Sequence, residues 1–325
     1  MKVLYKYYSE NFDVVDHLKN PAIKLATTRS LNDPFEVQLS NELAKSLTNK
    51  RLKIFDEKLL KDKKFREDVK KSYQIVSNQF GIISLTETHR NILMWAHYAN
   101  SHKGVCIGYK KTFIDELNHR EHPISDEWKG IYTPEKIRYD SKRFELEIDS
   151  EETENEIIMQ AMLKKSDDWI YEKEHRCIVP FHMADRFKLI RENSGSMNFI
   201  ANEEKLKRIE KISEEKGYKS LLTGMSHIRQ MRKIAHTNGL IMLKDIDVNS
   251  ICSIFIGSKC NKKTEQSIID EIESNKSRYG HVSVYRYHIH GNDFKLYTEG
   301  LINWKLLTDI NDALLENELD VFQLP

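Results

Sequence analysis

The sequence predicts an α+β fold, with mixed sheets and flanking helices. Short runs rich in β-branched and aromatic residues alternate at irregular spacing with segments of helical apolar periodicity. No internal repeat of about 20 to 50 residues is visible, which excludes a solenoid. A chain of 325 residues can bury a sizeable core, and we expect one α+β domain over residues 1–325.

Composition is typical of a globular protein, with 31% charged and 39% hydrophobic residues. The formal net charge of +1 excludes a globally basic nucleic-acid binder. No run reaches the roughly 18 apolar residues that a membrane span requires. The amino terminus lacks the apolar core of a signal peptide, and the four cysteines form no CxxC pair. We therefore expect a cytoplasmic protein that does not enter a membrane.

The first half of the chain shows predicted strands separated by helices. Strands are predicted at 3–8, 22–27, 81–86 and 104–109, and helices at 11–19 and 91–100. A helical insertion, rich in Lys, Leu, Asp and Glu, is predicted over about 41–78. Ahead of it, Asn32 and Asp33 precede Pro34, which predicts a turn because both side chains can bond the local backbone.

The second half contains two charged insertions, expected over about 140–160 and 186–236. A strand pair is predicted over 131–139, and residues 186–198 are predicted to form a loop. The segment 221–236 holds the strongest basic cluster of the chain and could contact phosphates, although solvated basic faces are common. The last third predicts strands at 240–243, 253–257, 282–288 and 294–297, with a helix at 264–274.

The most informative stretch is Trp169–Pro180, which reads Trp-Ile-Tyr-Glu-Lys-Glu-His-Arg-Cys-Ile-Val-Pro. It runs from a polar segment into an apolar one, so a buried strand is predicted at its end. Alternation along a strand places Glu172, Glu174 and Arg176 on one face. Such a group is costly to bury unless it serves a site. The alternative is a solvated strand end in which Arg176 pairs with one glutamate.

Five blocks of the sequence, in this order, resemble the bacterial DUF2971 (domain of unknown function) family. The blocks are Leu4–Tyr7, Leu31–Glu36, Met94–Ala99, His102–Ile107 and Trp169–Arg176. The residues Ile256–Lys259 and Phe294–Leu296 are similar to its carboxyl end, so the resemblance extends over residues 1–300. The family name implies no activity.

A more distant similarity is to ADP-ribosyltransferase-like folds, which bind NAD in a cleft between two small sheets. Such folds use a first strand with an aromatic and a polar residue, a second with Ser, Thr or Tyr, and a late strand with a catalytic glutamate. The similarity implies the following residues in that order: Tyr5, Lys6 and Tyr7; Thr27 and Thr28, or Ser84 and Thr86; and Glu172 and Glu174. Lys6 departs from the pattern, because His or Arg is usual there.

This similarity implies transfer of ADP-ribose from NAD, used as a substrate, to a protein or nucleic-acid acceptor. A carboxylate near the ribose stabilises the oxocarbenium-like state of that reaction, and we assign this role to Glu174, with Glu172 activating the acceptor. The expected NAD-binding residues are Tyr5, Tyr7 or Trp95 for ring stacking, Arg176 or Lys103 for the pyrophosphate, Asn32 and Asp33 for the loop at the cleft, and Lys6, Thr27, His97 and Tyr98 as further contacts.

Two alternatives remain open. The first is a metal-dependent nuclease in which four carboxylates hold Mg²⁺ and a basic residue lies near the scissile phosphate. Its residues are Asp33, Glu36, Glu172 and Glu174, with Lys103 or His97. The second is a non-catalytic module that binds a nucleotide or a partner protein through a surface of Trp95 and Tyr98.

Two kinds of nucleotide chemistry are disfavoured, because the chain has no GxGxxG or GxxxxGKS loop. These are Rossmann-type redox reactions and P-loop nucleotide hydrolysis. For either enzyme, a toxin or phage-defence effector is the expected biological setting, by analogy alone.

Overall fold

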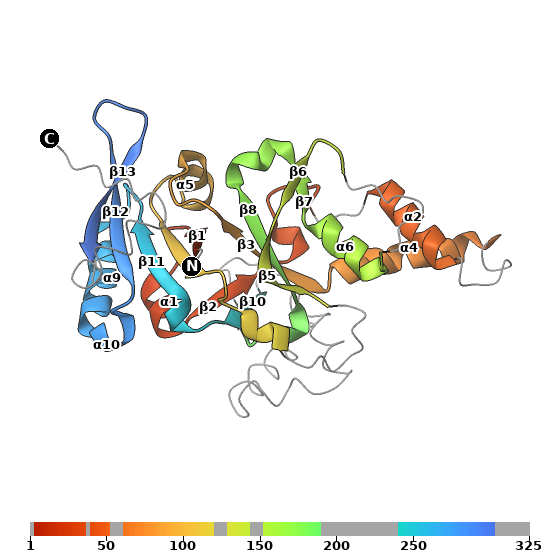
Figure 1. The fold of residues 1–325 in the computed structure, drawn as a ribbon, viewed down its shortest axis with the longest axis horizontal. Helices are drawn as coiled ribbons and strands as arrows, with labels where there is room; N and C mark the ends of the chain where they lie inside the picture. Colours follow the sequence, from red (N-terminus) through yellow and green to blue (C-terminus); the bar gives the residue numbers. More distant parts are fainter. Residues whose placement is uncertain are drawn as a thin grey trace, which may run out of the picture. The chain divides into compact units, whose positions relative to one another are not determined.

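The computed structural model describes residues 3–36, 40–52, 61–119, 129–143, 152–189 and 240–302. The fold is α+β, as the sequence predicts, with parallel and antiparallel strand pairs and several helices (Figure 1). The chain divides into two compact units, each assembled from separated segments. The first unit combines Met1–Pro21, Thr86–Phe113 and Asp247–Pro325, and the second combines Ala22–Leu85 and Ile114–Ile246. The expectation of a single domain stays a prediction.

The first unit contains five neighbouring strands in the order β13-β12-β11-β4-β1. They are β1 (Val3–Tyr8), β4 (Val105–Lys110), β11 (Ile251–Ile256), β12 (Ser283–Ile289) and β13 (Leu296–Ile302). Neighbouring strands are antiparallel except for β11 and β12, which are parallel. In the register of β1 and β4, Tyr5 lies opposite Gly108. These five strands of the first unit therefore already form a mixed sheet, with both parallel and antiparallel pairs.

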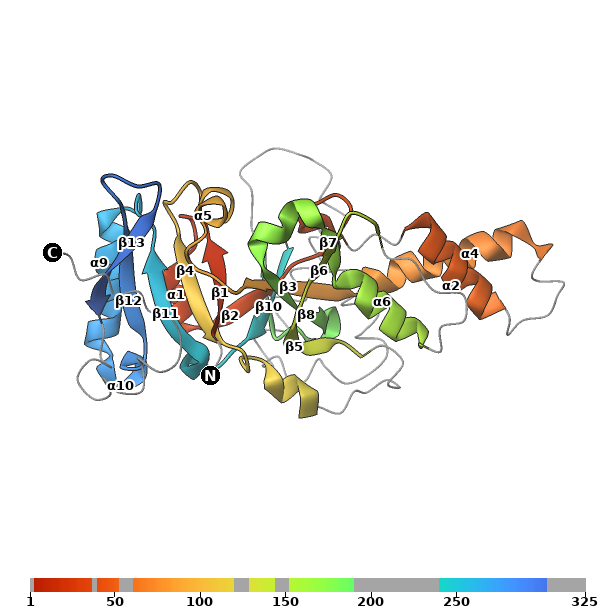
Figure 2. The same ribbon diagram turned by 45° about the horizontal axis from the view of Figure 1, so that its top comes forward.

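Helices of the first unit are short, apart from one. They are α1 (Val14–Lys19), α5 (Ile92–Tyr98), α9 (Lys262–Ser274) and α10 (Lys276–Tyr279), with a 3-10 helix η8 at Val248–Ser250. In the views of Figures 1 and 2, α9 and α10 lie beside β11 and β12. An ion pair of 3.1 Å between Lys19 Nζ and Glu271 Oε2 joins α1 to α9. Asn91 begins α5, because its side chain accepts the N–H groups of Leu93 and Met94.

The connection from α5 to β4 is conformationally unusual. Asn100, Ser101 and His102 all have left-handed φ angles, of 45°, 56° and 70°. Backbone hydrogen bonds hold this run, including one of 3.0 Å from Lys259 N to His102 O. Gly104 lies two residues after this run ends at His102, and a Cβ at Gly104 would overlap the carbonyl oxygen of Tyr8. The close approach of two backbones therefore requires glycine here.

The second unit contains three groups of paired strands. They are β3 (Phe80–Thr86), β8 (Glu174–Pro180) and β5 (Ile131–Lys136) in that order; β2 (Ala22–Leu25), β10 (Leu240–Asp245) and β9 (Arg186–Leu189) in that order; and the parallel pair β6 (Arg138–Asp140) and β7 (Lys164–Ser166). An isolated bridge between Ala26 and Ile82 links the chain after β2 to β3.

Three longer helices of the second unit cover a common core. They are α2 (Asn41–Leu52), α4 (Lys63–Ser77) and α6 (Glu154–Met162), and the 3-10 helices are η1 (Thr28–Ser30), η2 (Asp115–His119), η4 (Asp167–Glu172) and η5 (Phe181–Met183). Figures 1 and 2 show α2 and α4 side by side. A capping box of Thr153 and Glu156 begins α6. The core cluster includes Leu43, Leu47, Tyr73, Phe80, Ile157, Met162 and Ile178.

Most predicted strands and helices are present, and the structure differs from the prediction in the bounds and pairing of a few strands. The strand alternation predicted for Glu172, Glu174 and Arg176 does not include Glu172, because residues Asp167–Glu172 form η4 and the strand begins at Glu174. Residues Arg186–Leu189 form β9, so the prediction of a loop there is wrong. The two strands predicted over 131–139 are present as β5 and β6, but their predicted pairing is wrong, because β5 pairs with β8 and β6 pairs with β7.

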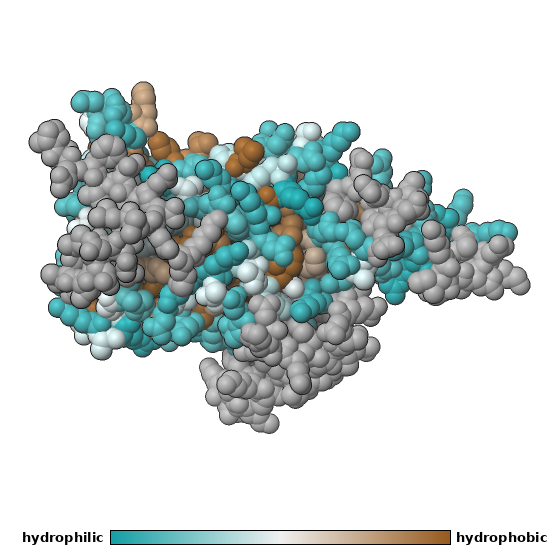
Figure 3. Space-filling view, viewed as in Figure 1, coloured by the Kyte–Doolittle hydropathy of each residue, from teal (hydrophilic) through white to brown (hydrophobic). Residues whose placement is uncertain are grey.

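The basic segment 221–236 lies outside the described residues, as does most of the charged insertion predicted over 186–236. Within the described part of the chain, every helix is too short or too polar to cross a bilayer. On the face drawn in Figure 3, hydrophilic residues predominate and hydrophobic ones form small separate patches. All four cysteines are free thiols.

We expect Gly104→Ala to lower the free energy of unfolding by about 1–3 kcal/mol, because the added methyl group must displace the backbone of Tyr8. Urea unfolding followed by circular dichroism measures this change. Gly300→Ala is the matched control, since its nearest neighbour would be the Tyr285 ring at 4.0 Å. Equal stability of the two variants would contradict the close approach at Gly104.

Candidate functional site

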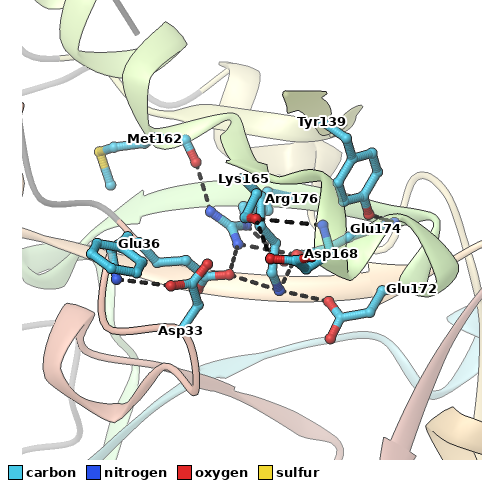
Figure 4. Close-up of polar contacts among 11 residues, drawn as sticks. Asp33, Glu36, Tyr139, Met162, Lys165, Asp168, Glu172, Glu174 and Arg176 are labelled. Carbon is cyan, nitrogen blue, oxygen red and sulfur yellow. Dashed lines mark hydrogen bonds and ion pairs between the residues drawn. The ribbon is translucent and has the colours of Figure 1, made fainter. Parts of the chain in front are cut away.

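The candidate site is a group of charged side chains in the second unit, drawn in Figure 4. We call it the carboxylate cluster, and its members are Glu36, Lys165, Glu172, Glu174 and Arg176. All five side chains are buried, which is rare for ionisable groups unless they are paired. They come from the turn that contains Glu36, from β7, from the end of η4 and from the start of β8. The cluster thus joins segments that are distant in the sequence.

The turn between η4 and β8 brings two of the carboxylates together. Lys173 has a left-handed φ of 46° and ends η4, with its N–H donating to the carbonyl of Ile170 at 3.2 Å. Glu172 is the last residue of η4, and Glu174 is the first residue of β8. The three residues predicted to share one face do meet in the cluster. Glu172 reaches it through the turn at Lys173 and not through strand alternation.

Lys165 lies among three carboxylates. Its Nζ is 2.6 Å from Glu172 Oε2, 2.7 Å from Glu36 Oε1 and 3.2 Å from Glu174 Oε2. An ammonium group has three hydrogen-bond donors, so it can serve each carboxylate with one. Figure 4 shows the three acidic side chains pointing toward this one. Lys165 therefore connects all the carboxylates of the cluster.

Arg176 is the second cation, and it is completely buried. Its Nε and Nη2 donate to the two oxygens of Glu174, at 2.6 and 3.0 Å, which is the bidentate geometry that guanidinium favours. Nη2 also donates to Glu36 Oε1 at 2.9 Å, and Nη1 donates to the carbonyl of Met162 at 2.8 Å. These contacts enclose Arg176, so in this structure it positions Glu174 and Glu36 and has no surface for a pyrophosphate.

The turn of Asp33 directs Glu36 into the cluster. Asp33 Oδ1 accepts the N–H of Phe35 at 2.8 Å, and its carbonyl accepts the N–H of Glu36 at 3.2 Å. Asp33 is therefore a buried structural residue of the loop, in keeping with the loop-fixing role that the sequence suggested. Asn32, next to it, is exposed.

Two aromatic side chains border the cluster. The Tyr139 hydroxyl accepts the backbone N–H of Glu174 at 2.7 Å, which fixes the start of β8. The ring of Trp169 lies 4.8 Å from Lys165 Nζ, within the range of a cation–π interaction. Burial raises the pKa of Tyr139 to about 12, so its hydroxyl stays protonated at neutral pH. The cluster thus has neutral aromatic groups on its border.

The charges of the cluster do not cancel. Three carboxylates face two cations, so one negative charge is in excess when all five groups are ionised. A buried site with surplus negative charge favours a further positive charge, or a proton, near it. This surplus is the chemical property that the arrangement offers.

The ionisation of the cluster is set by mutual pairing. Burial raises the pKa of Glu174, but Arg176 and Lys165 outweigh burial and hold that pKa well below its usual range. Burial alone lowers the pKa of Lys165, whereas Glu174, Glu36 and Glu172 raise it above its usual range. The pKa of Arg176 is raised in the same manner by Glu174 and Glu36. These three groups therefore remain charged at neutral pH.

Trp95 does not lie on an exposed binding surface, which corrects that expectation. The side chain is fully buried in the first unit, and its indole N–H donates to the carbonyl of His89 at 2.8 Å. The ring of Tyr7, also buried, packs against it edge-on at 5.1 Å between centroids. Both rings are thus core residues, which leaves them no face for stacking on a ligand.

The remaining predicted residues of the first unit lie on β1, on α5 and after it. His97 is exposed, and Tyr98 is half-buried. Lys103 is exposed, with its Nζ 3.9 Å from Glu10 Oε2. Tyr5 and Lys6 of β1 are both half-buried. The single NAD pocket expected from these residues together with Glu174 stays a prediction.

Thr27 belongs to the second unit, where its carbonyl accepts the hydroxyl of Ser30 at 2.9 Å. It lies at the start of η1 and has a structural role there. Its expected contact with NAD stays a prediction.

Sequence reasoning missed Lys165 and assigned Glu36 to the nuclease alternative alone. The available signal was the pair Lys164 and Lys165 directly before the Trp169 stretch. In β7 the two lysines point to opposite sides, Lys164 to Asp140 at 2.7 Å and Lys165 to the cluster. Only the fold shows which of the two is buried.

The carboxylates named for a magnesium site meet only in part. Glu36, Glu172 and Glu174 converge, but on the ammonium of Lys165, while the carboxylate of Asp33 binds the backbone of Phe35. Among the described residues, no group of three or more His, Cys, Asp or Glu side chains is arranged to hold a metal ion.

Comparison with known proteins identifies one family. A family model described as "Protein of unknown function (DUF2971)" matches residues 94–177. The resemblance to this family is thereby confirmed over that stretch, which includes α5 from Met94 onward, β4 and the sequence around Trp169 but not the turn of Glu36. No curated protein and no solved structure matches the chain.

The pairing of Glu174 predicts a loss of stability in acid. Because its folded pKa lies below the ordinary value of 4.5, its contribution is present above pH 4.5 and is lost as the pH falls toward the folded pKa. The loss is about 1.4 kcal/mol per unit of pKa difference. We expect urea unfolding between pH 7 and 3 to show a shallower acid decline for Glu174→Gln than for the unsubstituted chain. An equally steep decline in Glu174→Gln would contradict the pairing; Glu135→Gln, an exposed site on β5, is the control.

Proposed function

We propose that the chain transfers ADP-ribose from NAD to a protein or nucleic-acid acceptor, with the carboxylate cluster as its reactive centre. The observation that carries this proposal is that three buried carboxylates face two buried cations, which leaves one negative charge in excess when all five groups are ionised. Paired charges of this kind also occur as purely structural elements.

The reaction breaks the bond between nicotinamide and ribose through an oxocarbenium-like state. Positive charge develops on the ribose, and a carboxylate fixed near it lowers the energy of that state. Water is excluded from the carboxylate cluster, so its surplus charge acts more strongly there than at the surface. Nicotinamide leaves as a neutral molecule, and the nucleophile of the acceptor forms the new bond to the ribose carbon and gives up its proton.

The contacts favour Glu172 for the ribose and Glu174 for positioning, whereas the sequence suggested Glu174 for the ribose and Glu172 for activating the acceptor. Both oxygens of Glu174 bind Arg176, and one of them also binds Lys165. The negative charge of Glu174 is therefore paired with two cations. Glu172 binds Lys165 through Oε2 and lies at the end of a surface helix.

Access to Glu172 requires η4 to move, because Glu172 is only 3% exposed. The rest of η4 lies at the surface, where Ile170 is 61% exposed and Asp168 is exposed as well. NAD binding therefore includes an opening at η4 in this proposal. The acceptor is a protein or a nucleic acid, and the biological setting that fits is a cytoplasmic toxin or antiviral effector, by analogy.

A metal-dependent nuclease is the second candidate, favoured by the meeting of Glu36, Glu172 and Glu174. These are three of the four carboxylates that the nuclease requires, and they come from separated segments. The ammonium group of Lys165 occupies the position between these carboxylates, so a nuclease would require this side chain to move away before a metal ion could bind there.

We expect the purified chain to release nicotinamide from NAD and to continue in the presence of a chelator, since Lys165 already supplies the cation between the carboxylates. Glu172→Gln preserves the size of the side chain and removes its charge. The rate should fall about 100-fold or more, which is the usual effect of removing one group that stabilises transition-state charge. Chromatography of nicotinamide and a thermal melt of each variant are the measurements.

Glu135→Gln is the matched control, because it removes an exposed carboxylate from the neighbouring strand β5. Retained NAD turnover in Glu172→Gln, together with a lowered melting temperature, would show that the cluster is purely structural. Cleavage of RNA or DNA that needs Mg²⁺ and no NAD would favour the nuclease. Binding of NAD without turnover would favour a non-catalytic module.

A further inference from the structure

The space among Glu36, Glu172 and Glu174 has the chemistry of a cation site. One oxygen from each lies between 2.6 and 3.2 Å from a common point, which is the nitrogen of Lys165. Carboxylate oxygens are also the ligands that Mg²⁺, Mn²⁺ and Ca²⁺ prefer, at about 2.0 to 2.6 Å. The ligand chemistry is therefore that of a divalent-metal site, although the three carboxylates are arranged around the ammonium of Lys165 and not around a metal ion.

We propose that Lys165 is the tethered cation of this site: it positions the three carboxylates and takes the place that a divalent metal ion would occupy without it. The inference concerns the cation of the cluster and stands whether or not the chain acts on NAD.

Enclosure of the ammonium supports this role. Lys165 is 8% exposed, and the ring of Trp169 lies over its Nζ at 4.8 Å. β7 pairs with β6, which fixes the backbone from which the side chain extends. A cation held by its own backbone cannot be lost by dilution or chelation, unlike a bound ion.

Repulsion among the carboxylates gives the physical reason for a cation here. Three ionised carboxylates in a buried volume cannot all keep their charge without opposite charge beside them. Arg176 binds Glu174 and Glu36. Lys165 binds both of these and Glu172 as well. Removing Lys165 therefore leaves Arg176 facing three carboxylates, with a surplus of two negative charges.

Lys165→Ala in the full chain tests the proposal, with Mn²⁺ as the probe. The substitution opens the space of three methylene groups and an ammonium while keeping the carboxylates. We expect the variant to bind Mn²⁺ at least tenfold more tightly than the unsubstituted chain. Electron paramagnetic resonance of free Mn²⁺ measures the binding, and the melting temperature of the variant should rise as MnCl₂ is added.

Lys164→Ala is the matched control, because Lys164 is the neighbouring residue of β7 and pairs with Asp140 outside the cluster. It should bind Mn²⁺ no better than the unsubstituted chain. The proposal is overturned if Lys165→Ala is folded and gains no Mn²⁺ affinity. It is equally overturned if the unsubstituted chain already binds Mn²⁺ as tightly as the variant.

Lys165→Ala is also informative if it does not fold in the absence of metal. Folding of Lys165→Ala on addition of Mn²⁺ would support the proposal, and failure to fold at any Mn²⁺ concentration would overturn it. Lys165→Ala combined with Glu172→Gln restores the original surplus of one negative charge but leaves two carboxylates. We expect this double variant to regain stability and to lose the Mn²⁺ affinity. NAD turnover enters none of these measurements, so their outcome is separate from that of the proposed function.

Discussion

The ion pairs between Lys165 and its three carboxylate partners fix the local geometry of the second unit. They join four segments at one point, namely the turn that runs from Asp33 to Glu36, strand β7, helix η4 and strand β8. Burying charged groups is unfavourable unless each is paired and hydrogen-bonded, and here each carboxylate has at least one cation at 2.6 to 2.9 Å. Loss of either cation increases the excess of negative charge in this buried group, whereas loss of one carboxylate removes that excess. The cluster therefore behaves as a single structural element.

The same pairing gives the cluster its chemical character. Arg176 and Lys165 keep Glu174 ionised, which the lowered pKa of this carboxylate reflects. Among the described residues, two cations face the three carboxylates, so the cluster carries one negative charge in excess when all five groups are ionised. An enclosed anionic site is suited to stabilise positive charge, whether on a ribose or on a metal ion. The identity of the cation between the carboxylates thus decides between the two candidate chemistries.

Part of the fold and site follows from sequence patterns, and part depends on tertiary structure. The apolar run Cys177–Val179 predicts β8, and the charged residues before it mark the site correctly. Local patterns contain no information about Lys165 meeting Glu36, because these residues are brought together by the fold alone. The left-handed turn at Lys173 escapes prediction because lysine has no preference for that conformation. Trp95 was expected at the surface, yet contacts from distant strands bury it.

A double-mutant cycle between Lys165 and Glu172 tests the central claim most directly. Unfolding free energies are measured for Lys165→Met, for Glu172→Gln and for the double variant. The cluster predicts a coupling of at least about 1 kcal/mol, with the double variant more stable than the sum of the single losses implies. Additivity within about 0.5 kcal/mol would contradict the claim, because the two side chains would then be energetically independent.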